Sequence, residues 1–131
     1  MKYLLDTMVW LWSVSSVENI GADGHAILAD QDAEIYLSVA STWEISIKAR
    51  IGKFTLPEPP PTYIPKRLTE QNIQALTINQ THALKVYELP LHHRDPFDRL
   101  IIAQALTEEM TVLTSDRGFE KYPIEIIWCG K

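Results

Sequence analysis

The sequence has little cysteine and no excess of positive charge. Its single cysteine, Cys129, excludes a disulfide within the chain and favours a reducing compartment, and we expect it to be a small buried apolar residue. The formal net charge of −5 argues against a broad basic surface for duplex DNA, because non-specific affinity for DNA comes mostly from neutralised phosphates. A nucleic-acid enzyme in which cations supply the positive charge remains compatible with it.

Long apolar runs and glycine-rich loops are also missing. The first apolar run, residues 3–5, stops at Asp6, which leaves no stretch of secretory or membrane-spanning length. We therefore expect a cytoplasmic protein. Gly21 and Gly24 lack the third glycine and the preceding strand of a phosphate-binding loop. The length of 131 residues and the hydrophobic content of 46% fit one ordinary domain with a normal core.

Short β-rich runs alternate with helical patterns along the chain. A proline-rich stretch, 56–61, is expected to be a stiff extended connector. Alternation of strands and helices predicts an α/β fold with a parallel sheet covered on both faces. Strands are expected at 3–5, 34–39, 73–78, 111–114 and 125–128, and helices after Asp6 and at 23–30, 41–51, 63–70, 81–89 and 96–106, with Ser41 as the cap of the third helix.

Four carboxylates recur where predicted strands end or predicted helices begin: Asp6, Glu44, Asp98 and Asp116. In a parallel α/β fold those positions converge at one crevice. Four ionised carboxylates roughly 5 Å apart would repel by about 3 kcal/mol per pair at an effective dielectric near 20. A fold tolerates this only where acids are protonated, basic side chains intervene or cations bind. Hard oxygen ligands favour Mg²⁺ or Mn²⁺, whereas zinc would call for histidine or cysteine.

Asp98 is the strongest single candidate among these acids. Ile101, Ile102 and Ala105 follow it at helical spacing, so its carboxylate lies on the apolar face of the helix. A helix-dipole role, worth about 0.3–1 kcal/mol, would not offset the burial of an unpaired acid. Asp95 stands before a proline and is expected to cap the same helix. It is also a candidate extra acid of the site.

The other three acids each have an ordinary structural explanation. Asp6 could simply cap a helix after its strand, and Asp116 could be a turn residue ahead of Gly118. Glu44 has Lys48 four residues further on, which is the spacing of a helical ion pair. Their case as site residues depends on all four acids lying at the ends of elements.

Other residue types offer weaker candidates. His92 and His93 are adjacent, so they cannot form the i, i+4 pair that binds zinc on a helix, and we expect surface or loop positions. Ser115 has no nucleophile elbow around it. Trp10 and Trp43 lie on apolar stretches, which predicts core or interface anchors rather than base-stacking platforms.

The motifs that carry these residues resemble those of PIN-domain ribonucleases, specifically the VapC toxins of type II toxin-antitoxin pairs. Leu4-Leu5-Asp6-Thr7 is similar to the opening strand and first acid of that family, and residues 41–48 (STWEISIK) to its second acidic helix. Residues 93–105 (HRDPFDRLIIAQA) resemble a distinctive block of one subgroup, and Thr114-Ser115-Asp116 the last acid. Met8 departs from the family, whose members often carry histidine there.

This resemblance implies a Rossmann-like three-layer αβα sandwich with a mainly parallel central sheet, built as a single PIN-like domain over residues 1–131. It also implies a ribonuclease dependent on Mg²⁺ or Mn²⁺ that hydrolyses RNA phosphodiester bonds with metal-activated water and so inhibits translation. The implied partners are an RNA substrate, a second copy in a homodimer and a cognate antitoxin protein, within a larger toxin-antitoxin assembly in some cases.

On this hypothesis three acids, Asp6, Asp98 and Asp116, hold one or two metal ions. Glu44 is either a further ligand or the group that orients the attacking water. Basic residues that flank the acids could receive RNA phosphates or form salt bridges within the cluster. They are Lys48, Arg94, Arg99 and Arg117.

Two alternatives stay open at this point. A receiver-like phospho-signalling domain is also a compact α/β fold with acids at strand ends. Here, however, Asp6 is followed by Thr7 rather than a second acid, and Asp116 stands where a lysine would be expected. A catalytically silent PIN module that only pairs with an antitoxin would differ in having no activity.

Overall fold

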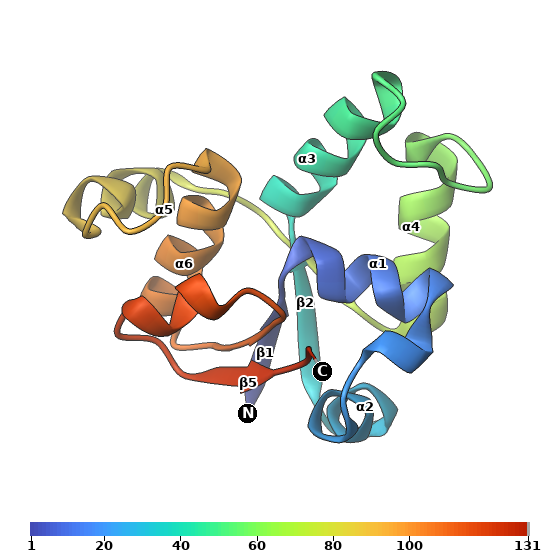
Figure 1. Ribbon diagram of the computed structural model, residues 1–131, viewed down its shortest axis with the longest axis horizontal. Coiled ribbons are helices and arrows are strands. Elements are labelled where there is room, and N and C mark those ends of the chain that lie inside the picture. Colours follow the sequence, from blue (N-terminus) through green and yellow to red (C-terminus); the bar gives the residue numbers. More distant parts are fainter. Residues whose placement is uncertain (131) are drawn as a thin grey trace.

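The computed structural model describes residues 1–130 and forms one five-stranded sheet in which every pair of neighbours is parallel (Figure 1). Its strands are β1 (Lys2–Leu5), β2 (Glu34–Ser38), β3 (Gln74–Leu76), β4 (Thr111–Thr114) and β5 (Ile126–Trp128). The predicted α/β class with a parallel sheet is confirmed. Lys131, the last residue of the expected domain, lies outside the described residues.

Helices cover both faces of this sheet. They are α1 (Thr7–Ser15), α2 (Ala22–Ala29), α3 (Val39–Arg50), α4 (Pro60–Gln71), α5 (Gln80–Lys85) and α6 (Pro96–Glu108), with short 3₁₀ helices η1 (Val17–Asn19), η2 (Val86–Glu88) and η3 (Arg117–Lys121). In Figure 1, α1, α2 and α4 lie to the right of the sheet and α5 and α6 to the left, while α3 continues upward from β2. Across residues 1–130, every helix is too short or too polar to cross a membrane.

Alternate side chains of the strands divide the core into two clusters. Leu5, Leu37 and Leu113 pack with side chains of α1 and α4 on one face, and all three are fully buried. Leu4 and Val112 pack with side chains of α6 and η3 on the other face. Helices cover both apolar faces of the sheet, so a ligand can reach it only at the ends of the strands. The polar side chains at the carboxyl ends of the strands are therefore the ones that can form a site.

The start of α3 differs from the prediction. Ser38, not Ser41, caps this helix, since its Oγ accepts a hydrogen bond of 2.9 Å from the backbone N–H of Ala40. The chain therefore passes from β2 into α3 without a loop. Ser41 lies in the first turn instead, where its hydroxyl oxygen is 2.9 Å from that of Thr7. This shift brings α3 against the beginning of α1.

The proline-rich stretch is only partly extended. Pro59 keeps an extended backbone (φ −56°, ψ 145°), as expected for the connector, but Pro60 already begins α4. Proline is well suited to the first helical turn, because its fixed φ matches the helix and its missing N–H would have no helical partner there. The predicted connector over residues 56–61 was therefore too long at its carboxyl end.

The strand order, β3-β2-β1-β4-β5, places a topological switch point beside β1. Leu5 is level with Leu37 on β2 and with Leu113 on β4, so the carboxyl ends of the three strands meet. Doubly wound sheets bind ligands in the crevice at such a point. Receiver domains have the different order 2-1-3-4-5, so the topology excludes the receiver alternative.

Candidate metal centre

Five acidic side chains gather in one cleft at the carboxyl edge of the sheet. Asp6 follows β1, Glu44 comes from α3, Asp95 and Asp98 open α6, and Asp116 follows β4. The cleft encloses about 150 Å³ and is lined by Asp6, Thr7, Met8, Glu44, Lys48, Phe54, Asp95, Asp98, Ser115 and Asp116. The structure thus brings together every acid that the sequence singled out, including Asp95.

Asp6 is the most deeply fixed of the acids. Its side chain is buried and accepts hydrogen bonds from the backbone N–H of Val9 at 2.8 Å, from Thr114 Oγ1 at 2.5 Å and from the N–H of Ser115 at 3.3 Å. Burial raises the pKa of Asp6 above its ordinary value, although the hydrogen bond from Thr114 acts in the opposite direction. The bond from Val9 also makes Asp6 the cap of α1.

Glu44 is buried beside two donors. Its Oε1 accepts from the Thr7 hydroxyl at 2.7 Å, and its Oε2 accepts from Lys48 Nζ at 2.6 Å. The helical ion pair suggested by the sequence is therefore present, and it lies inside the cleft rather than on an outer face. The hydrogen bond to Glu44 raises the pKa of Lys48.

Asp98 carries the least compensated charge of the cluster. Its carboxylate has no hydrogen bond or ion pair with any side chain or backbone group of residues 1–130. Burial, followed by the charges of Asp95, Glu44, Asp6 and Asp116, raises the pKa of Asp98 from 3.8 to about 8. A bound cation would remove this penalty by favouring the ionised form. Asp98 is therefore the position at which the cleft most needs a positive charge.

Asp95 has the capping role that its place before a proline predicted. Its Oδ1 accepts from the backbone N–H groups of Phe97 at 2.8 Å and Asp98 at 3.2 Å. The same side chain lines the cleft, so the two roles suggested for it coexist.

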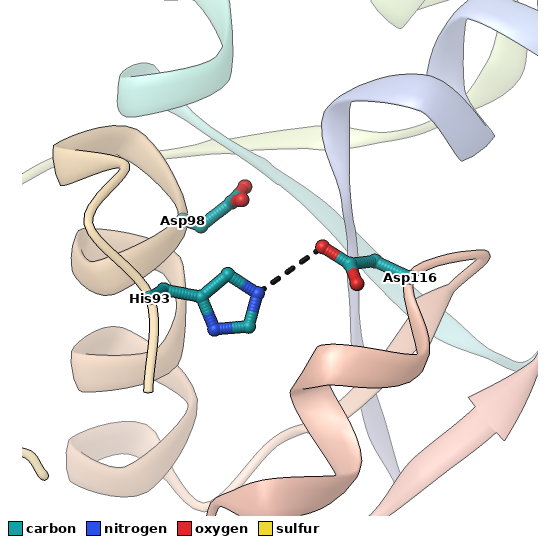
Figure 2. Close-up of side chains that lie close together, drawn as sticks. All are labelled: His93, Asp98 and Asp116. Carbon is teal, nitrogen blue, oxygen red and sulfur yellow. Dashed lines mark hydrogen bonds and ion pairs between the residues drawn. The ribbon is translucent and has the colours of Figure 1, made fainter. Parts of the chain in front are cut away.

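Asp116 is held at the start of η3. Its Oδ1 accepts from the N–H of Gly118 at 2.8 Å, which is the turn interaction suggested by the sequence. Its Oδ2 lies 3.1 Å from Nε2 of His93, as Figure 2 shows. The backbone N–H of Asp116 donates to Thr114 Oγ1 at 3.0 Å. Thr114 therefore joins the first and last acids of the cleft.

His93 is a site residue that the sequence analysis missed. It lies in a loop, as expected, but its side chain is only 12% exposed. One ring nitrogen and one carboxylate oxygen each from Asp98 and Asp116 lie within 4.8 Å of one another. No periodic spacing in the sequence connects His93 to an acid. Its place at the start of the block 93–105 was therefore the one sequence signal that it belongs to the site.

Two of the four basic candidates are engaged with acidic side chains. Lys48 contacts Glu44, as described, and Arg117 donates to Glu120 at 2.6 Å. The Arg117 guanidinium also lies 3.6 Å from the ring centroid of Trp128. Arg94 is exposed and forms no ion pair within residues 1–130. Lys48 belongs to the cleft itself, whereas Arg117 and Arg94 flank it in sequence.

Arg99 does not fit the phosphate-binding role suggested for it. The residue is 8% exposed. Its guanidinium donates to the backbone carbonyls of Val86 at 3.0 Å and Pro90 at 2.9 Å, with longer contacts of 3.4 Å to Leu89 and His93. The guanidinium N–H groups that a phosphate would need are therefore already bonded to these carbonyls. We assign Arg99 a structural role, in which it holds the loop that includes His93.

Fold and cleft together define a doubly wound α/β domain with an acidic cleft at the switch point of its sheet. The model of the PIN domain family matches residues 3–125. The chain therefore belongs to the PIN-domain family.

Several known proteins similar to this chain carry VapC or VapBC names. Ribonuclease VapC16 of Mycobacterium tuberculosis (strain ATCC 25618 / H37Rv) is 40% identical over 57 residues, which are 44% of this chain and 40% of that protein. The matched part is thus less than half of that relative. VapBC2 from Rickettsia felis, solved with a promoter DNA fragment, aligns with TM-score 0.75 at 17% identity over 98% of this chain and 99% of that one. DNA-bound VapBC from Salmonella typhimurium aligns with TM-score 0.70 at 19% identity over 97% of each chain. At these identities the two structures support the fold alone.

Proposed function

We propose that this chain is a divalent-metal-dependent endoribonuclease that acts in the cytoplasm as the toxin of a toxin-antitoxin pair, through one PIN-like domain over residues 1–131. Hydrolysis of RNA phosphodiester bonds would then inhibit translation. The observation that carries the proposal is the state of Asp98, which is partly buried among four other acids and has no compensating partner in the described chain. The similarity to a named VapC ribonuclease supports the choice of RNA as substrate.

The donor set fits a hard divalent cation. All five acids offer carboxylate oxygens, and Lys48 is the one basic side chain that lines the cleft within residues 1–130. Such a set suits Mg²⁺ or Mn²⁺ better than softer metals, and nucleases of the PIN family are typically metal-dependent. Asp6, Asp98 and Asp116 would hold the cation. When bound, it would lower the pKa of a coordinated water and stabilise negative charge on the scissile phosphate.

Glu44 would orient the attacking water. Each of its carboxylate oxygens already accepts one hydrogen bond, from Thr7 or from Lys48, and these fix the plane of the carboxylate. A carboxylate oxygen has two acceptor positions, so each oxygen retains one for a water molecule. Lys48 is 32% exposed at its side chain and can attract the phosphate while it remains in contact with Glu44. Arg94 supplies a second exposed positive charge near the start of α6.

A cleavage assay tests the proposal directly. Structured RNA is incubated with the wild-type chain and with Asp98→Asn, in Mg²⁺ or Mn²⁺ and in EDTA. We expect metal-dependent cleavage by the wild type and a loss of at least about a hundredfold in Asp98→Asn, the scale on which removal of one charge-stabilising group lowers a rate. Asp32→Asn, which neutralises an exposed acid outside the cleft, serves as the matched control. Equal rates for wild type and Asp98→Asn would contradict the nuclease and favour a silent binding module.

The exposed apolar side chains of α3 indicate a protein partner. Trp43 and Ile47 of α3, and Ile51 at its C-cap, follow one another at four-residue spacing and are 54%, 41% and 62% exposed. Such a stripe suits a second copy of the chain in a homodimer, with an antitoxin helix or tail laid across the acidic cleft. The test is co-expression with the product of the adjacent gene, followed by measurement of the mass of the purified complex. Failure to recover any complex would contradict the antitoxin partner.

A further inference from the structure

His93 is held through its backbone and through two aromatic rings that pack against its imidazole. The backbone N–H of His93 donates to the hydroxyl of Tyr122 at 2.8 Å. Its imidazole meets the ring of Phe119 edge to face, with centroids 5.4 Å apart and planes at 84°. The same imidazole lies 5.5 Å from the ring centroid of Tyr122. The imidazole is therefore enclosed, with only 12% of the side chain exposed.

Gly118 provides the space that the His93 ring occupies. A Cβ atom at position 118 would lie 2.5 Å from Cε1 and 2.7 Å from Nε2 of His93, closer than real Cβ atoms approach other atoms. The backbone of η3 therefore reaches the imidazole only because residue 118 has no side chain. This approach is what places the ring beside Asp116, the cap of the same turn.

The two ring nitrogens have different surroundings. Nε2 faces Asp116 Oδ2 at 3.1 Å, whereas Nδ1 is buried without a partner in residues 1–130. Figure 2 shows the Nε2 edge of the ring turned toward Asp116, with Asp98 pointing into the same space. A proton on Nε2 gives Asp116 a donor and leaves a bare lone pair on Nδ1. The other neutral tautomer would bury an unpaired N–H and place two acceptors face to face.

Asp116 needs such a donor because its side chain is 47% exposed and could rotate freely in solvent. The N–H of Gly118 holds Oδ1 at 2.8 Å, and His93 holds Oδ2. With one donor on each oxygen, the carboxylate has a single orientation and still keeps an acceptor position on each oxygen. Outer partners of this kind commonly orient the carboxylates that bind metals.

We propose that His93 is a positioning residue of the metal centre, whose Nε2–H holds the Asp116 carboxylate in the orientation that binds a divalent cation together with Asp98. This inference rests on the proposed function, since it concerns the cation of that site. The rival role is direct ligation of the cation by the imidazole, which the spacing of 4.8 Å among the three groups also allows.

Calorimetric titration of the purified full chain with Mn²⁺ and with Mg²⁺ tests the inference. We expect His93→Ala to lower the affinity for both ions by about tenfold, as loss of an outer partner typically does. His93→Gln should recover most of the loss, because its amide N–H extends to nearly the same position as Nε2–H. His92→Ala is the control, since His92 is exposed and its ring contacts Tyr122 rather than an acid.

Gly118→Ala provides a second test that leaves His93 in the sequence. Its new methyl group should displace the imidazole and weaken cation binding to the level of His93→Ala. In the double variant the imidazole is gone and only a tight approach of 3.1 Å between the methyl group and Asp116 Oδ1 remains, so we expect little loss beyond that of His93→Ala alone. Losses that multiply would overturn the inference, because they would show that the two residues act independently.

The remaining outcomes separate this inference from the proposed function. Unchanged affinity in His93→Ala, with cation binding by the wild type, would overturn the role of His93 alone. Failure of His93→Gln to recover affinity, or a loss confined to Mn²⁺, would overturn it in favour of imidazole ligation, since nitrogen ligands favour Mn²⁺ over Mg²⁺. Absence of cation binding by the wild type would overturn both the metal centre and the role of His93.

Discussion

The hydroxyl of Thr114 donates a hydrogen bond of 2.5 Å to the carboxylate of Asp6, 108 residues away in the chain. Its oxygen also accepts from the backbone N–H of Asp116 at 3.0 Å. Thr114 is fully buried at the carboxyl end of β4. One side chain therefore couples the acid that follows β1 to the acid that follows β4, at the switch point of the sheet.

Replacement of Thr114 by valine should break this coupling while keeping the shape of the side chain. Asp6 loses a hydrogen bond that favours its ionised form, so its pKa should rise further and its affinity for a cation should fall. The N–H of Asp116 loses its acceptor, and the free energy of unfolding should fall by about 1–3 kcal/mol. Denaturant unfolding and Mn²⁺ titration measure the two effects.

The matched control is Thr111→Val, at the other end of the same strand. Thr111 is also buried, but its hydroxyl has only a long contact of 3.4 Å with Glu125. We expect little change in cation affinity for this variant. An equal loss of affinity in both variants would show that the strand, and not the Thr114 hydroxyl, is responsible.

The raised pKa of Asp98 should make the metal-free protein less stable as the pH rises. Asp98 ionises near 3.8 when unfolded and at about 8 when folded, so the folded state binds more protons between those values. The contribution of Asp98 to the free energy of unfolding is therefore fully present below about pH 4 and is lost as the pH rises toward 8. In EDTA at pH 8, the free energy of unfolding of Asp98→Asn should exceed that of the wild type by about 2–4 kcal/mol. This is less than the full pKa shift would give, because Asp98 is partly solvated.

Unfolding in urea at pH 5, 6, 7 and 8, with EDTA and with Mn²⁺, measures this dependence. The burial of Asp6 acts in the same direction, so Asp98→Asn should flatten the decline without abolishing it. Mn²⁺ should restore the stability of the wild type at pH 8 and have a smaller effect on Asp98→Asn. Wild-type stability that increases from pH 5 to pH 8 in EDTA would contradict the raised pKa.

Removal of the Lys48 charge should separate cation binding from RNA binding. Lys48 donates to Glu44 at 2.6 Å and is also influenced by the charges of Asp95 and Asp98. It therefore competes with a cation for the acids. We expect Lys48→Met to bind Mn²⁺ about threefold to tenfold more tightly and to show a higher KM for RNA. The checks are calorimetry and steady-state cleavage kinetics.

Lys53→Met, which removes an exposed lysine outside the cleft, is the control for Lys48→Met. Weaker Mn²⁺ binding by Lys48→Met would have a different meaning. It would show that Lys48 acts chiefly by holding Glu44 in place rather than by competing with the cation.

Much of the site could be predicted because it depends on local rules. Asp6 and Asp116 follow strands of a parallel sheet, and parallel strands end together. Asp98 lies on the apolar face of a helix, and that helix packs against the core. The start of α3 was misplaced because Ser38 and Ser41 are both good caps. The choice between them depends on how far β2 extends, and this is set by its pairing with β1 and β3.

The supporting residues could not be predicted because their partners are distant or belong to the backbone. Thr114 reaches Asp6 across the whole chain, and His93 depends on the empty space at Gly118. Arg99 binds carbonyl groups, which every residue possesses and no pattern of side chains marks. Such residues become visible only when the loops are placed.

Arg99 should therefore be needed for stability and for the position of His93 rather than for RNA binding. Its guanidinium donates to a carbonyl of η2 and to carbonyls of the loop between η2 and α6, including that of His93 itself. Lysine keeps the charge but lacks the planar set of five donors. We expect Arg99→Lys to lower the free energy of unfolding by about 2–3 kcal/mol, since hydrogen bonds to charged groups are among the stronger ones.

The same variant should weaken Mn²⁺ binding, because a loosened loop no longer holds the imidazole against Asp116. Arg94→Lys is the control, since Arg94 is exposed on the same loop and the change should stay within about 0.5 kcal/mol. Denaturant unfolding and Mn²⁺ calorimetry at one pH measure both quantities for the two variants. If Arg99→Lys kept its stability and its cation affinity but raised the KM for RNA, Arg99 would be a phosphate contact after all. The carbonyl contacts would then be replaced when RNA binds.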